Sequence, residues 1–367
     1  MARLTKLIRE MPATVPFVGP EVIERERGRK FRARLGANES GFGPSPKVIE
    51  AMRAADAEVW KYPDSGSSEL REALAAHHGV EPENIVVGAG IDGLFSTLAA
   101  LMIDEGTPVV TSEGAYPTFN FSINGRGGAL HKVPYVNDME DPASLVAKAR
   151  EVDAALVYLA NPDNPMGGMH GPDVVARMVN ELPEGALLLL DEAYAELAPK
   201  DMLPKIDAND PRVIRMRTFS KAYGMAGARV GYAIGAPELI AEFEKVRNHF
   251  GMNRSALIGA QAALADQGWL THIRTEVRSA RDRITEIARR NGLNALPSHT
   301  NFVAIEVGSP ERAKAIITEL AARDIFIRMP FAAPQNRCIR VSVGPREELD
   351  LFAEALPEVL KATDDLG

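Results

Sequence analysis

Short apolar runs, each followed by a polar loop and a helix-like stretch, recur along the middle of the chain. The run at 186–190 (ALLLL) lacks the alternation of a half-exposed strand. Continuous runs of this kind are typical of parallel strands that are buried on both faces of a sheet. We therefore predict an α/β fold in which helices cover a mostly parallel seven-stranded sheet, with strands at 84–87, 108–111, 130–134, 154–159, 186–190, 212–216 and 230–234.

The pattern changes after about residue 236, where longer helical stretches begin. The helical spacing and the remaining apolar runs predict a second, smaller α/β domain, with helices at 238–248, 255–265, 269–291 and 310–323 and strands at 301–307, 325–329 and 338–343.

The Gly- and Pro-rich stretch 36–46 cannot continue a helix or a central strand, so it marks a boundary near the start of the chain. We expect an N-terminal arm (1–44) that joins the small domain, a large cofactor-binding domain (45–250) and a small C-terminal domain (251–367).

Composition limits the kind of protein this chain can be. Its 367 residues exceed one ordinary core, and 46% apolar with 25% charged residues are typical of a globular protein. The apolar runs are too short for a membrane span, the N-terminus lacks the apolar core of a signal peptide, and a net charge of −8 disfavours nucleic acid. Because the single cysteine, Cys338, cannot form an intrachain disulfide, we expect a cytoplasmic protein without membrane, nucleic-acid or metal partners.

The segment 218–229 (TFSKAYGMAGAR) carries the clearest indication of chemistry. It places Lys221 among small residues at the end of a buried strand, with the hydroxyl of Ser220 before it and Arg229 eight positions later. A lone lysine is usually a solvated surface residue. A poorly solvated lysine can instead form an imine with an aldehyde, while the hydroxyl and the arginine hold a phosphate.

Asp191 directly follows the 186–190 run and is expected at a strand end of low dielectric constant. A carboxylate there persists only beside a cation or several hydrogen bonds, and a protonated pyridine ring is such a cation. Tyr194, in the same loop, can donate to an oxygen on that ring. A helix N-cap aspartate is the alternative. Together with Lys221, these residues suggest pyridoxal phosphate (PLP) as the cofactor.

A glycine-rich loop at 88–93 (GAGIDG) follows a strand and opens an apolar helix. Its free amides and the helix dipole form an anion site. The loop also matches the GxGxxG dinucleotide fingerprint, with Glu113 about twenty residues further on, so a nucleotide-dependent oxidoreductase is an alternative function. A tight strand-to-helix turn without a ligand is another interpretation.

The loop 161–167 (NPDNPMG) follows another predicted strand. Its two prolines and its glycine make it rigid, so it can aim an amide side chain, and Asn164 is the best-aimed candidate. Taken alone, the same sequence is also that of an ordinary turn.

In this order along nearly the whole chain, the motifs resemble the fold-type I PLP-dependent aminotransferases of class I/II, and most closely the histidinol-phosphate aminotransferase branch. The resemblance is carried by LGANESGFGPSP, YPDSGSSELREALA, VVGAGIDG, NPDNPMG, LLLLDEAYAEL, RTFSKAYGMAGARVGY, SHTNFV and CIRVSVG.

The resemblance implies a division of roles around PLP. Lys221 would bind the cofactor and later move a proton on the substrate, and Asp191 would pair with the pyridine nitrogen. Asn164 and Tyr194 would contact the phenolic oxygen. The phosphate would be held by Ser220, Arg229 and the amides of Ile91 and Asp92.

The resemblance also implies further contacts. Phe119 would stack on the cofactor ring, with Tyr116 as the alternative, and Tyr62 would reach the phosphate from the neighbouring subunit of a homodimer. The substrate would be bound by Asn38, Asn164, Arg328 and Arg340, with Arg340 on its anionic group.

Several departures from the family pattern affect the substrate rather than the cofactor. The family often has Asp-Glu where this chain has Asp92-Gly93, and Pro-Thr-Gly at 165–167, where this chain has Met166. It also often has a tyrosine near the position of Ser122. Histidinol phosphate with glutamate as the amino donor is the first expectation, and aromatic amino acids are the second. A related decarboxylase of threonine phosphate shares much of the motif set, and a PLP-binding regulator without turnover is a non-enzymatic alternative.

Overall fold

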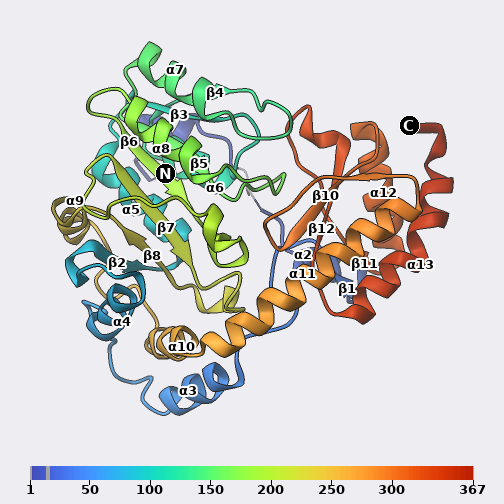
Figure 1. Cartoon of the computed structure of the whole chain (residues 1–367), viewed down its shortest axis with the longest axis horizontal. Coiled ribbons are helices and arrows are strands. Elements are labelled where there is room, and N and C mark those ends of the chain that lie inside the picture. Colours follow the sequence, from blue (N-terminus) through green and yellow to red (C-terminus); the bar gives the residue numbers. More distant parts are fainter. Residues whose placement is uncertain (1, 14–16, 367) are drawn as a thin grey trace.

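A seven-stranded sheet forms the larger half of the structure, a computed structural model that describes residues 2–13 and 17–366 (Figure 1). Its strands are β2 (Ile85–Gly88), β3 (Pro108–Ser112), β4 (Ala129–Val133), β5 (Leu156–Ala160), β6 (Leu187–Asp191), β7 (Val213–Thr218) and β8 (Gly231–Ile234). They lie in the order β2-β8-β7-β6-β5-β3-β4, and all pairs are parallel except those of β8. The predicted fold class is confirmed, and each of the seven strands predicted for this sheet is present with its ends displaced by two residues at most.

Helices cover both faces of this sheet, as Figure 1 shows. They are α4 (Ser68–His78), α5 (Gly90–Met102), α6 (Pro117–Asn124), α7 (Pro142–Val152), α8 (Pro172–Glu181) and α9 (Pro237–Glu242). Beyond them, α10 (Arg254–Ala265) packs against α4, and α3 (Pro46–Asp56) packs against α10.

Alternate side chains of β6 pack against opposite faces. Leu187 and Leu189 share a core cluster with residues of α5 and α6, whereas Leu188 and Leu190 share another with residues of α7 and α8. Because both faces are buried, the strand carries no polar alternation. Asp191 continues the phase of Leu187 and Leu189, so its side chain lies on the α5 face of the sheet.

The smaller half is built on an antiparallel sheet in the order β12-β10-β9. Near the N-terminus, the arm forms α1 (Lys6–Glu10) and α2 (Pro20–Arg27). The arm then pairs its strand β1 with β11 in parallel, which ties it to the small half. The elements of this half are β1 (Ala33–Arg34), β9 (Asn294–Ala295), β10 (Phe302–Glu306), α12 (Pro310–Ala322), β11 (Ile325–Phe326), β12 (Cys338–Ser342) and α13 (Arg346–Ala362).

One long helix, α11 (Gln267–Arg290), runs from the large half to the small one (Figure 1). Asp266 caps its N-terminus by accepting a hydrogen bond from the backbone N–H of Trp269. Its buried residues recur every three or four positions, which is the spacing of one helix face: Leu270, Ile273, Val277, Ala280, Ile284 and Ile287.

One predicted helix is shorter than expected. The stretch 238–248 forms α9 only as far as Glu242 and then a 3-10 turn, Phe243–Lys245. Phe243 is fully buried, but Val246 in the next turn is 45% exposed, so no apolar face anchors a longer helix there.

The division at 250/251 stays a prediction. The seven strands of the large sheet all lie before residue 250. The helix that follows this boundary, α10, packs against α3 and α4 rather than against the small sheet.

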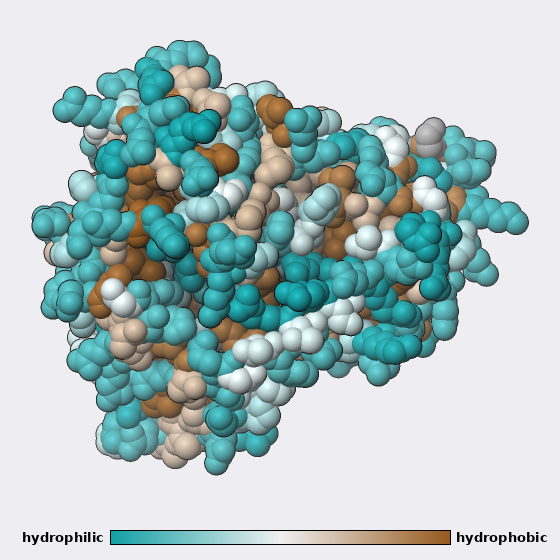
Figure 2. Space-filling model, in the orientation of Figure 1, coloured by the Kyte–Doolittle hydropathy of each residue, from teal (hydrophilic) through white to brown (hydrophobic). Residues whose placement is uncertain are grey.

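The face drawn in Figure 2 is mainly hydrophilic, and its hydrophobic residues gather in patches mostly over the half that holds the seven-stranded sheet. Among residues 2–13 and 17–366, none of the helices combines the length and the apolar character that a membrane span needs.

Candidate functional site

The carboxyl ends of β6 and β7 bring Asp191 and Lys221 to one edge of the sheet. β6 ends at Asp191, which pairs with Met216 of β7, and β7 ends at Thr218, three residues before Lys221. In open parallel sheets this edge is where ligands bind. The positive charge of Lys221 acts on Asp191 there and lowers its pKa, against the larger effect of burial.

Lys221 is a partly buried amine at this edge. Its Nζ donates a hydrogen bond to the backbone carbonyl of Asn38 (3.0 Å) and lies 5.6 Å from the ring centre of Tyr194. Burial lowers the pKa of Lys221 to about 8, and the positive charge of Arg340 acts in the same direction. Because only the neutral amine is a nucleophile, the lowered pKa favours reaction with a carbonyl group near neutral pH.

Asp191 is a buried carboxylate with two donors. The hydroxyl of Tyr158 donates to Oδ2 (2.7 Å), and the backbone N–H of Ala193 donates to Oδ1 (3.0 Å). Burial nevertheless raises the pKa of Asp191 to about 6. A cation placed against this carboxylate would keep it charged at neutral pH.

An anion cradle lies at the first turn of α5. Gly90 has φ +74°, and a Cβ there would come within 2.5 Å of Nη2 of Arg229. That guanidinium donates to Oγ of Ser220 and to Asp92, each at 3.3 Å. The first amides of α5, including that of Ile91, have no side-chain cap and no partner within the helix. A cation, a hydroxyl and free amides together fit a phosphate.

Arg340, in β12, reaches this edge from the small half. Its Nη1 donates to Oδ1 of Asn164 (2.6 Å), and its Nε is buried with no partner among the described residues. Burial lowers the pKa of Arg340, while Tyr194 and Asp163 act in the opposite direction. A buried guanidinium with an unused donor is a favourable place for an anionic group.

Asn38 joins the arm to both halves. Its Nδ2 donates to the hydroxyl of Tyr194 (3.2 Å), and its Oδ1 accepts from Oγ of Ser342 (2.9 Å). Burial raises the pKa of Tyr194, so its phenol stays protonated and remains a hydrogen-bond donor.

Arg328 lies beside Arg340, but its guanidinium contacts the arm. The two arginines are joined by a backbone hydrogen bond from Arg340 N to Arg328 O (2.6 Å). The guanidinium of Arg328 lies 3.8 Å from the ring centre of Phe17 and donates to the carbonyl of Val18. Burial, followed by the charge of Arg340, lowers the pKa of Arg328 to about 10. An anion at Arg328 would therefore meet the arm as well.

The two candidate stacking residues have different surroundings. Phe119 is 1% exposed, with its ring stacked on Tyr158 (4.4 Å between centres) and edge-on to Phe95 (5.6 Å). Tyr116 precedes α6, and its hydroxyl donates to Oδ1 of Asp92 (3.2 Å) at the anion cradle. Phe119 is thus enclosed by aromatic neighbours in the core, whereas Tyr116 borders the anion cradle.

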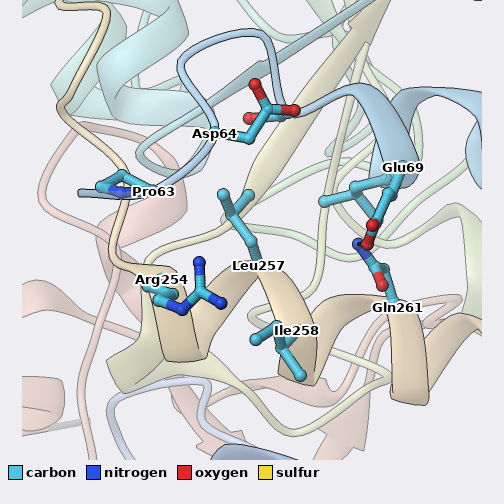
Figure 3. A pocket seen from close by; sticks show the side chains of 9 residues that line it. Pro63, Asp64, Glu69, Arg254, Leu257, Ile258 and Gln261 are labelled. Atoms are coloured by element: carbon cyan, nitrogen blue, oxygen red, sulfur yellow. Dashed lines mark hydrogen bonds between the residues drawn. The ribbon is translucent and has the colours of Figure 1, made fainter. Parts of the chain in front are cut away.

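Tyr62 lies on the surface, 79% exposed, with its ring 5.0 Å from that of Phe250. A cavity of about 140 Å³ opens next to it, between the loop that carries Asp64 and the side chains of Arg254 and Gln261 on α10 (Figure 3). This cavity contains none of the residues predicted to bind the cofactor or the substrate.

Residues 33–356 match the family model of aminotransferase class I and II. The chain belongs to this family. The histidinol-phosphate aminotransferase of Moorella thermoacetica is 32% identical over 350 residues, which cover 94% of this chain and 90% of the relative. That of Dinoroseobacter shibae is 33% identical over 324 residues, which cover 88% and 90%.

A solved structure agrees over almost the full length. The histidinol-phosphate aminotransferase of Sinorhizobium meliloti, in complex with pyridoxal-5'-phosphate, is 50% identical, with a TM-score of 0.95 and coverage of 99% of this chain and 98% of that chain. The resemblance drawn from the motifs is thereby confirmed, and this chain is an aminotransferase.

Membership of this family removes the dinucleotide interpretation of the 88–93 loop. The sheet order gives the physical reason. β2, which leads into the loop, is an edge strand whose partner is the antiparallel β8. The strand that carries the dinucleotide fingerprint lies instead at the centre of a parallel sheet, beside the point where the strand order reverses.

Sequence reasoning missed the residues that hold the site side chains in place through hydrogen bonds. Tyr158 donates to Asp191, and its only sequence signal is that it is the one hydroxyl-bearing residue in the run 154–159. In the 161–167 loop, Asp163 accepts hydrogen bonds from the hydroxyl of Tyr135 (2.8 Å) and the backbone N–H of Met166 (3.0 Å), which fixes the loop that carries Asn164.

Glu192, next to Asp191, has a different set of partners. It is fully buried and accepts hydrogen bonds from Arg215 (3.0 Å) and Arg217 (2.8 Å) of β7. Burial alone would raise its pKa, but the two arginines outweigh that effect and lower the pKa to about 2. Glu192 is therefore a buried, paired acid, because both arginines of β7 point at it.

Proposed function

We propose that this chain is a PLP-dependent aminotransferase that moves an amino group from glutamate onto an oxo phosphate to give histidinol phosphate. The convergence of Lys221, Asp191 and Arg229 on one sheet edge is the observation that carries the proposal. The names of the relatives and the 50% identity to the Sinorhizobium meliloti enzyme support the substrate. A role in amino-acid biosynthesis follows from that substrate.

The donor set of the site fits PLP. Lys221 supplies an amine for the aldehyde, and Asp191, whose pKa burial raises to about 6, needs a cation such as a pyridinium. We propose that Tyr116 stacks on the face of the cofactor ring and that Asn164 and Tyr194 contact its phenolic oxygen. The phosphate would be held by Ser220, Arg229 and the amides of Ile91 and Asp92. When bound, PLP supplies an electron sink that lowers the barrier to removing the proton from the substrate α-carbon.

The residues of the chain then have separate roles in proton transfer, hydrogen bonding and charge stabilisation. Lys221, with a pKa near 8, is neutral often enough near pH 7.5 to accept a proton and can return it at close range. Tyr194 stays protonated and donates, whereas Asp191 maintains a negative charge behind the ring. Burial of Asp191 and Tyr194 keeps both groups largely away from water, which strengthens their interactions.

Arg340 is our proposed contact for the anionic group of the substrate, with Asn38, Asn164 and Arg328 beside it. We expect Arg340→Ala to raise the KM for histidinol phosphate by about 30-fold or more, because a buried guanidinium that pairs with an anion contributes a few kcal/mol. The affinity for PLP should change less than about threefold. Steady-state kinetics and PLP titration check this, with the exposed Arg346→Ala as the control; equal losses of both affinities would contradict the assignment.

A homodimer is the proposed assembly, with Tyr62 reaching the phosphate in the neighbouring subunit. The exposure of Tyr62 on an apolar surface with Val59, Trp60 and Phe250 supports this. Variants Lys221→Ala and Tyr62→Ala should each be weakly active. Mixed and re-associated in equal amounts, they should recover about a quarter of the wild-type activity, because half the dimers are hybrids with one intact site. No recovery in verified hybrids would show that Tyr62 serves its own subunit.

The substrate is tested with a panel of amino donors and oxo acceptors. We expect histidinol phosphate with 2-oxoglutarate to react best in the reverse direction, since the unused donor of Arg340 favours an anionic group. Faster amino transfer from phenylalanine or tyrosine would favour the aromatic alternative. Loss of carbon dioxide from threonine phosphate would favour the decarboxylase.

A reducing, cytoplasmic location is also part of the proposal. The single cysteine, Cys338, is buried, and burial raises the pKa of its thiol to about 12, so it is kept as an inert packing residue.

A further inference from the structure

Asn301 lies where the arm, the small sheet and Lys221 meet. It directly precedes β10, its side chain is 1% exposed, and its backbone carbonyl accepts a hydrogen bond from Val343 N (2.8 Å). Its Nδ2 donates to the backbone carbonyl of Asn38 (2.9 Å) and to that of Glu39 (3.3 Å). One buried amide group thus donates hydrogen bonds to two consecutive backbone carbonyls of the arm.

The Asn38 carbonyl is also the acceptor for Nζ of Lys221, at 3.0 Å. A carbonyl oxygen has two lone pairs, so the amide of Asn301 and the amine of Lys221 together use its full capacity. Asn38 has φ +55°, a left-handed conformation that costs about 1 kcal/mol in a residue with a side chain and needs support from its neighbours.

That support comes from both halves of the molecule. Oγ of Ser342, in β12, accepts from the backbone N–H of Asn38 (3.1 Å) and donates to its Oδ1 (2.9 Å), whereas Tyr194 in the large half accepts from its Nδ2 (3.2 Å). These contacts fix the side chain of Asn38. Among the described residues, Asn301 is the side-chain donor to its carbonyl besides Lys221 itself.

We propose that Asn301 is a positioning residue for Lys221, acting through the Asn38 carbonyl. The assignment rests on the proposed function of Lys221. Through this contact, the position of the small half sets where the amine is held while it is free to transfer a proton. Proton transfer is sensitive to such placement, since a displacement of about 1 Å can cost about 100-fold in rate.

Several charged groups already act on the pKa of Lys221, and a charged substitution at position 301 would add one more. Burial lowers the pKa of Lys221, the positive charges of Arg340 and Arg229 lower it further, and the acids Asp92 and Glu39 raise it. Asn301→Asp removes the amide donor and adds a carboxylate next to this set, whereas Asn301→Ala removes the donor without adding charge. An added negative charge favours the ammonium form of Lys221.

Ser298→Ala provides a matched control for the loop. Oγ of Ser298 donates to the carbonyl of Phe302 (2.5 Å), so it supports the entry to β10 as Asn301 does. It has no hydrogen bond to Asn38 among the described contacts. A purely structural role of the loop would affect Ser298→Ala and the Asn301 variants alike.

The experiment follows the visible absorption of PLP in the purified holoenzyme as a function of pH, together with kcat and KM for glutamate and the melting temperature. We expect the pKa of the absorption change to rise by about one unit in Asn301→Asp. In Asn301→Ala, kcat should fall about tenfold while KM changes less than about threefold. Ser298→Ala should keep the wild-type pKa and kcat.

Wild-type behaviour of both Asn301 variants, or the same change in all three variants, would overturn the proposal. If Asn301→Ala fails to fold, the near-isosteric Asn301→Asp, which also lacks the donor to Asn38, decides the matter by its fall in kcat relative to Ser298→Ala. A wild-type protein that shows no PLP absorption or no amino transfer would contradict the proposed function instead, so the two failures are distinguishable.

Discussion

Replacing Lys221 with alanine is expected to reduce amino transfer by about 10⁴-fold or more while the fold is retained. The loss is large because the variant lacks both the amine that bonds the cofactor and the group that moves the proton. The fold should survive, since within the described part of the chain the Lys221 side chain hydrogen-bonds only to Asn38, and burial, which lowers its pKa to about 8, disfavours its charge. Transamination rates and circular dichroism measure the two effects.

Borohydride reduction gives an independent readout of the same variant. Reduction of the wild-type holoenzyme should attach the cofactor to a peptide that contains residue 221, and the label should be absent from Lys221→Ala. Lys132→Ala, at an exposed lysine of β4, should label and react like the wild type. Unchanged amino transfer by Lys221→Ala would refute the assignment of this residue.

Asp191→Asn is expected to lower kcat by about 10³-fold and, in the cofactor-free protein, to increase stability above pH 6. The loss of activity follows from removing the preorganised negative charge behind the cofactor ring. The gain in stability follows from burial, which raises the pKa of Asp191 from 3.8 to about 6 in the folded protein. An amide of the same shape keeps the position but carries no charge.

The sign of the pH dependence is set by the direction of that shift. A carboxyl whose pKa is raised by folding stabilises the native state fully below its unfolded pKa, and this contribution is lost as the pH rises through the folded pKa of about 6. For Asp191 the loss between pH 4 and pH 7 is of the order of 3 kcal/mol. The asparagine variant has no such loss.

Urea unfolding of the cofactor-free proteins checks this prediction. At pH 8 the free energy of unfolding of Asp191→Asn should exceed that of the wild type by about 1–3 kcal/mol, and near pH 4 the two should agree. Addition of PLP should stabilise the wild type more than the variant, because only the wild type gains an ion pair. A variant that is less stable than the wild type at pH 8 would contradict a buried, unpaired Asp191.

Much of the fold and part of the site followed from local sequence pattern. The doubly buried run ALLLL fixed β6, and Asp191 and Lys221 could be placed at one edge because parallel strands end on the same side of a sheet. The glycine at position 90 could be linked to an anion site, because a strand-to-helix turn exposes free amides. These inferences depend on short stretches of chain and on one general property of parallel sheets.

The remaining features depend on contacts between distant segments, which local pattern does not specify. Tyr158 supports Asp191 from a neighbouring strand, and Asn301 meets Asn38 across 263 positions. The order of residues in the motif favours Phe119 over Tyr116 as the stacking ring, and only the fold shows that Phe119 belongs to a core cluster. The surroundings of Arg328 also depend on the arm, whose side chains no local pattern assigns to that site.

Asp191 and Glu192 are consecutive acids with opposite electrostatic behaviour. Despite burial, Arg215 and Arg217 lower the pKa of Glu192 to about 2, so this carboxylate stays ionised near neutral pH. Asp191 changes its charge near neutrality and responds to whatever binds in front of it. Of these two neighbouring acids, Asp191 therefore carries a charge that depends on pH and on the group bound in front of it, whereas the charge of Glu192 does not vary near neutral pH.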